Sequence, residues 1–87
     1  MARIFSIDFI YHNTSHRAMV AVRQTAFHTE YKISLQSVEL QEFLLSDKIV
    51  SPGPDIFVFA NTSVQDYNEL MKQVLAAVTD HIHLVRH

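Results

Sequence analysis

The chain has 87 residues, of which 48% are hydrophobic and 18% are charged, so it suits one small globular domain with a thin core and is too apolar for a disordered tail. It contains no cysteine, which excludes a disulfide scaffold, a thiolate zinc site and a cysteine nucleophile. Its formal charge is −2, and its basic residues are scattered along the sequence. They form no phosphate-binding stripe, which argues against a nucleic acid partner.

We expect one domain over residues 1–87, located in the cytoplasm. The apolar segments are far shorter than the roughly 20 residues that a membrane-spanning helix needs, so we expect no membrane association. Ser6 and Asp8 interrupt the apolar segment near the N-terminus, and we therefore expect no signal peptide.

Alternation of apolar and polar side chains predicts three strands in the first part of the chain, at residues 3–11, 17–27 and 30–36. The side chains predicted to face the core are those of Phe5, Ile7, Phe9, Tyr11, Ala18, Val20, Val22, Tyr31, Ile33 and Leu35. Short connections between these segments predict an antiparallel meander.

Matching the apolar faces of these strands predicts how they pair. In the first hairpin Phe5 lies opposite Val22, and Asn13 and Thr14 form a two-residue turn. In the second hairpin Val22 lies opposite Leu35 and Ala26 opposite Tyr31, which leaves His28 and Thr29 at the turn.

The segment from Ser37 to Pro54 has two interpretations. Apolar residues recur at helical spacing behind Ser37, which predicts a short helix with Ser37 as its N-cap; an irregular excursion is the alternative. The sequence SPGPD, residues 51–55, then predicts a loop with a type II turn at Pro52 and Gly53. Residues 56–60, IFVFA, predict a fourth strand.

The last element is a long helix. Thr62 or Ser63 serves as its cap, with Gln65 or Asp66 as the reciprocal partner, and the helix continues to about Leu84. Its apolar residues form one broad arc, which indicates that the helix lies on the sheet. The predicted fold is therefore a two-layer α+β domain, with an antiparallel meander sheet of three to four strands and one long C-terminal helix packed on one face.

Six histidines invite a search for a metal site. His12 and His16 flank the first predicted turn but lack a third ligand. The group of Asp80, His83 and His87 shares one face at the end of the helix, where histidine also complements the helix dipole. These five residues are the candidate ligands, although we expect neither a metal nor a cofactor, and His81 is expected at the edge of the core with a hydrogen-bond partner.

We find no residues arranged for catalysis. The chain has no nucleophile elbow and a single glycine, so it lacks a glycine-rich phosphate loop, and we expect it not to be an enzyme. A small-molecule or metal-binding domain that uses the histidines is one alternative function, and a nucleic-acid accessory protein is another. Two Asn-Thr-Ser triplets match the glycosylation pattern, but we assign the first to a turn and the second to a helix start.

One helix covers one face of a sheet, so the other face needs an explanation. Four apolar residues are predicted on that second face, namely Ile4, Ile10, Met19 and Ala21. These are the candidate interface residues, because an exposed apolar patch favours a homodimer or a protein partner. The alternative is that the segment from Ser37 to Pro54 covers this face with Leu40, Phe43, Leu44, Leu45 and Ile49.

The segments FSIDFIY, MVAVRQ and ELQEFLL, followed by a C-terminal helix, resemble those of small uncharacterised α+β proteins of Bacteroidetes bacteria. The resemblance covers most of the chain and implies a bacterial cytosolic α+β protein. Because its elements are hydrophobic patterns, it implies no activity and no site residue.

Overall fold

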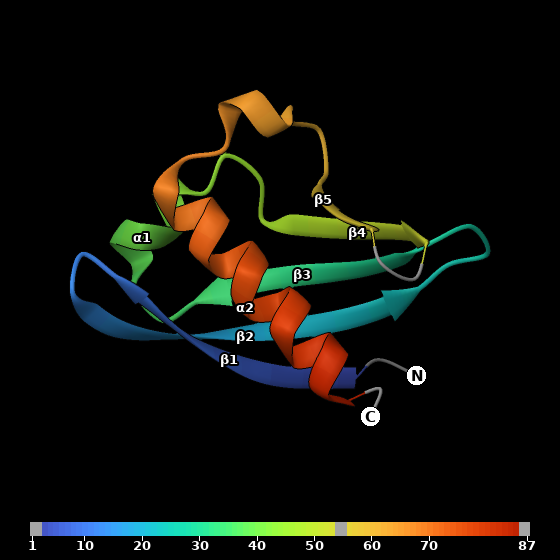
Figure 1. The fold of residues 1–87 in the computed structure, drawn as a ribbon, viewed down its shortest axis with the longest axis horizontal. Helices are drawn as coiled ribbons and strands as arrows, with labels where there is room; N and C mark the ends of the chain where they lie inside the picture. Colours follow the sequence, from blue (N-terminus) through green and yellow to red (C-terminus); the bar gives the residue numbers. More distant parts are fainter. Residues whose placement is uncertain (1–2, 54–55, 86–87) are drawn as a thin grey trace.

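The computed structural model describes residues 3–53 and 56–85. Five antiparallel strands form one sheet in the order β1-β2-β3-β4-β5, and a long helix crosses one face of the sheet (Figure 1). The elements are β1 (Arg3–Tyr11), β2 (Thr14–Gln24), β3 (Thr29–Leu35), α1 (Val38–Phe43), β4 (Lys48–Gly53), β5 (Ile56–Phe59), the 3-10 helix η1 (Val64–Asp66) and α2 (Glu69–Val85). The predicted α+β class and the C-terminal helix are confirmed, but the predicted number of three to four strands is wrong because the sheet has five.

The additional strand is β4. Its Ile49 is fully buried and lies between Tyr31 of β3 and Phe59 of β5. Sequence reasoning missed this strand because its alternation is short and ends in residues typical of turns. The pairing of β4 with β5 has a register shift between Val50 and Gly53. The predicted type II turn is wrong, since Gly53 lacks the positive φ that such a turn requires, and Pro54 lies outside the described residues.

The strands of the first hairpin pair in a register that differs by two residues from the prediction, and the turn comes one residue earlier. Phe5 lies opposite Val20, and Tyr11 lies opposite Thr14, so His12 and Asn13 form the turn. Their φ angles are 51° and 61°, as a type I′ turn requires at both central positions. A shift of two residues keeps every side chain on its face, so the apolar pattern does not distinguish the two registers and the turn conformation decides.

The second hairpin differs from the prediction by four residues. Val22 lies opposite Tyr31, and residues 25–28 form a four-residue loop between Gln24 and Thr29. The hydroxyl of Thr25 donates to the carbonyl of His28 at 2.9 Å and accepts from the His28 N–H at 3.1 Å. This local network replaces the predicted turn at His28 and Thr29, and the shift is again even, so the faces of the strands are unchanged.

Helix α2 begins at Glu69, later than the predicted start at Thr62 or Ser63. Asn68 provides the cap, because its side-chain oxygen accepts from the Met71 N–H at 2.9 Å. Ser63 instead caps η1. Four helix side chains are fully buried against the sheet, and the buried core consists of Ile7, Phe9, Ala18, Val20, Val22, Tyr31, Ile33, Leu44, Ile49, Phe59, Leu70, Met71, Val74 and Val78.

The predicted short helix is present as α1, and the Ser37 hydroxyl accepts from the Leu40 N–H at 3.3 Å. From α1, the Gln41 side chain accepts from the Leu35 N–H at 2.7 Å and donates to the Ile33 carbonyl at 3.3 Å. This residue therefore satisfies backbone groups of β3 beyond the end of β4. β4 extends the sheet, and Leu44 and Ile49 are buried in the same core as the α2 side chains, so the alternative in which the segment covers the second face is wrong.

Candidate functional site

Three of the four predicted interface residues lie together on the face of the sheet opposite α2. Ile4 of β1 lies directly opposite Ala21 of β2, and Met19 lies opposite Ser6, diagonally adjacent to Ile4. The exposed fraction is 64% for Ile4 and 45% for Met19, whereas Ala21 is half-buried. We call Ile4, Met19 and Ala21 the open-face cluster.

Ile10, the fourth predicted residue, lies apart from this cluster. It pairs with Ser15 near the first hairpin and is 58% exposed. Between it and the cluster, Arg17 Nε donates to Asp8 Oδ1 at 2.9 Å. This bond raises the pKa of Arg17, and it places two polar side chains between the two apolar positions. The predicted four-residue patch is therefore divided by an ion pair.

The open face becomes polar toward β3 and β4. A shallow hollow of about 470 Å³ lies there, lined by Ala21, Val22, Arg23, Glu30, Lys32, Asp47 and Lys48. Glu30 Oε2 lies 2.8 Å from His28 Nε2, and Glu30 Oε1 lies 3.8 Å from Lys48 Nζ. The contact with His28 is the main cause that lowers the pKa of Glu30. Glu30 therefore offsets the positive charge of Lys48 at this end of the open face, which makes this part of the surface less suited to a nucleic acid backbone.

The histidines mainly contact aromatic rings. His12 stacks on Tyr11 with ring centroids 4.0 Å apart, and His16 lies 5.7 Å from the ring of Phe9. His81 stacks on Phe5 with centroids 4.0 Å apart and an interplanar angle of 3°. The position of His81 at the edge of the core is therefore held by a ring contact with β1.

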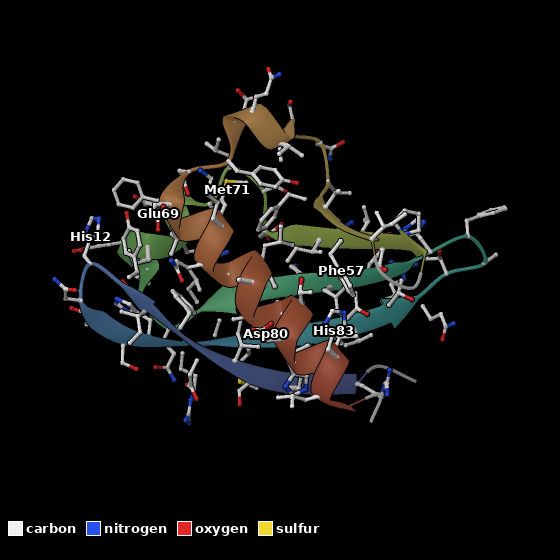
Figure 2. The ribbon with its side chains drawn as sticks, in the orientation of Figure 1. His12, Phe57, Glu69, Met71, Asp80 and His83 are labelled. Atoms are coloured by element: carbon white, nitrogen blue, oxygen red, sulfur yellow. The ribbon has the colours of Figure 1, made fainter. Side chains whose placement is uncertain are left out.

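The candidate metal ligands lie in two separate places. Figure 2 shows His12 at the hairpin end of the sheet and Asp80 and His83 on α2. His87 lies outside the described residues. Among residues 3–53 and 56–85, no three His, Asp or Glu side chains gather closely enough to hold a metal ion.

The two edges of the sheet differ. At the β5 edge the Phe59 N–H donates to the Tyr67 hydroxyl at 2.7 Å, and η1 follows β5 on this side (Figure 1). At the other edge, β1 has nine residues, and within residues 3–53 and 56–85 it pairs with β2 alone. A strand edge of this length exposes unpaired backbone N–H and C=O groups.

Sequence reasoning missed one exposed aromatic residue. Phe27 lies in the loop between β2 and β3 and is 88% exposed. The predicted register assigned residues 25–27 to the second strand, so it did not predict the loop that these residues form. The signal that would have revealed it is Thr25, whose hydroxyl bonds to backbone groups three residues later, as in loops of this kind.

Comparison with protein-family models, with curated proteins and with solved structures found no match. Within the described part of the chain, no helix has the length and apolar character needed to cross a membrane.

Proposed function

We propose that this chain is a small, non-enzymatic interaction module of the cytoplasm that binds a second copy of itself through the open face and free edge of its sheet. The observation that carries the proposal is the open-face cluster, which is exposed and adjoins the unpaired edge of β1. Exposed apolar patches beside a free strand edge are a feature that proteins normally cover or use for association.

The surroundings of the cluster support an interface. Side chains of both charges lie around it, with Asp8 and Arg17 on one side and Lys32 on the other. Protein interfaces commonly combine an apolar centre with a polar rim of this kind. The absence of cysteine supports a reducing compartment.

The oligomeric state tests the proposal. Light scattering coupled to size-exclusion chromatography is expected to give twice the chain mass of 10.0 kDa at tens of micromolar. Ile4→Glu places a charge in the cluster and shifts the protein toward the monomer. Val64→Glu is the matched control, because Val64 is 65% exposed on η1, which follows β5 at the opposite edge of the sheet, and this variant remains dimeric. A wild-type mass of one chain at every concentration would refute the proposal.

A further inference from the structure

We propose that two copies join through their β1 strands, antiparallel and edge to edge, about a two-fold axis at Ile7, so that two five-stranded sheets become one continuous sheet. This inference rests on the proposed function and specifies the contact at the free edge and its register, in which Ile4 is the member of the open-face cluster that meets the second copy. Its basis is the backbone of β1 together with the order of side chains along that strand.

The turn conformation determines which backbone groups of β1 are free. In a two-residue hairpin the residues that flank the turn, here Tyr11 and Thr14, form a hydrogen-bonded pair, and such pairs alternate along the ladder. Residues 3, 5, 7, 9 and 11 therefore direct their N–H and C=O groups toward β2. Ile4, Ser6, Asp8 and Ile10 direct theirs outward, and their side chains lie on the open face.

The sequence of this strand is self-complementary. Residues 4–10 read IFSIDFI, which is symmetric about Ile7 except that Ser6 is matched by Asp8. A two-fold axis makes each residue meet its symmetric position on the second copy, so a strand of this pattern suits an isologous contact. With the axis at Ile7, Ile4 lies opposite Ile10 of the second copy, and the Ser6 hydroxyl lies opposite the Asp8 carboxylate of the second copy, to which it donates.

The neighbouring registers are less favourable. Moving the axis to Ser6 places Ile4 opposite the Asp8 carboxylate of the second copy, and moving it to Asp8 places two carboxylates opposite each other. An axis between two residues would set outward-directed backbone groups opposite groups that already bond to β2. The register centred on Ile7 is the one that pairs apolar with apolar and a donor with a carboxylate, and it forms about eight backbone hydrogen bonds, two for each hydrogen-bonded pair.

The rest of the fold is compatible with this arrangement. The axis is perpendicular to the sheet, so the two α2 helices lie on the same face. The end of α2 lies over the Arg3 end of β1, where His81 stacks on Phe5 (Figure 1). The axis therefore places the two helix ends at opposite ends of the paired strands. The β5 edge is a poorer choice, since it has four residues and Tyr67 already occupies the Phe59 N–H.

Disulfide trapping tests the register, because the chain has no cysteine of its own. Ser6→Cys and Asp8→Cys proteins are mixed and mildly oxidised, and the linked product that contains one of each is measured by mass spectrometry. In a hydrogen-bonded pair the Cα atoms lie about 5.5 Å apart, which suits a disulfide. We expect this product to form at least tenfold faster than the corresponding product from a mixture of Ser6→Cys and Ile4→Cys, whose positions are several residues out of register.

A backbone variant gives an independent test. Ser6→Pro removes an outward N–H of β1 without removing a bond to β2, and proline is tolerated on edge strands. We expect it to raise the dimer dissociation constant at least tenfold relative to Ser6→Ala, which keeps the N–H. If the wild type is dimeric but the trapped product forms no faster than the control, or Ser6→Pro dimerises like Ser6→Ala, this inference is overturned and the proposed function stands. A monomeric wild type overturns both.

Discussion

The hydroxyl of Tyr67 accepts a hydrogen bond from the backbone at the β5 edge of the sheet. The substitution Tyr67→Phe removes this one oxygen atom. The Phe59 N–H donates to this oxygen at 2.7 Å, and Phe59 is 2% exposed. Tyr67→Phe keeps the ring, which contacts the Phe59 ring edge-on at 5.2 Å, and leaves a buried backbone donor without its acceptor. An unsatisfied buried donor lowers the free energy of unfolding by about 1–3 kcal/mol, which corresponds to a decrease in Tm of roughly 4–24 °C for a domain of this size.

Urea unfolding followed by circular dichroism measures the free energy of unfolding of Tyr67→Phe. The control is Tyr11→Phe, because the Tyr11 hydroxyl makes no hydrogen bond among the described residues, and we expect its effect to stay within about 0.5 kcal/mol. Hydrogen exchange of the Phe59 amide provides a local measurement, and its protection should fall in Tyr67→Phe. Equal stabilities of the two variants, with unchanged protection of this amide, would refute the assignment of Tyr67 as the edge acceptor.

Three further predictions concern pH, the core and the first turn. His28 lowers the pKa of Glu30, so this carboxylate stabilises the folded chain above its unfolded-state pKa, and the contribution is lost as the pH falls through the lower folded-state pKa. Glu30→Gln should therefore lose less stability than the wild type between about pH 7 and about pH 3 in urea titrations. Leu70→Ala should cost about 2–5 kcal/mol in the same assay because Leu70 is fully buried, and Leu84→Ala, at 76% exposure, should change stability by less than about 0.5 kcal/mol. Asn13→Val should lower the free energy of unfolding by about 1–2 kcal/mol, because the φ angle of 61° crowds a β-branched side chain. Asn13→Gly should leave this free energy unchanged, because glycine adopts positive φ angles without crowding. Equal Tm values for these two variants would contradict the type I′ turn.

The alternation of apolar and polar residues predicted which side chains face the core much better than it predicted which residues pair across the strands. All ten side chains predicted to face the core from the first three strands are buried or half-buried in the structure. Both hairpin registers were nevertheless wrong, by two and by four residues. An even shift leaves the inward and outward faces of a strand unchanged, so only the conformations of the turns distinguish the registers.

The sequence predicted only part of the candidate site, because alternation defines the face on which a residue lies but not the residues beside it. Ile4, Met19 and Ala21 lie on one face because of alternation, which the sequence contains. Their adjacency, and the separation of Ile10 by the bond between Asp8 and Arg17, depend on the register. The sequence also did not show that β4 extends the sheet, since a short strand ending in proline and glycine has the local signals of a loop.

By itself, the sequence determined the α+β class, the inward and outward faces of the first three strands, the Ser37 cap and the presence of one long amphipathic helix. These features follow from local periodicity and from side chains that bond to nearby backbone. Only the tertiary structure decided the registers, the fifth strand, the start of α2 at Glu69 behind its Asn68 cap, and which sheet edge is occupied and which is free. Those features depend on contacts between residues far apart in the chain, such as that between Asn68 Nδ2 and the Phe43 carbonyl at 2.7 Å, and local pattern carries no information about such contacts.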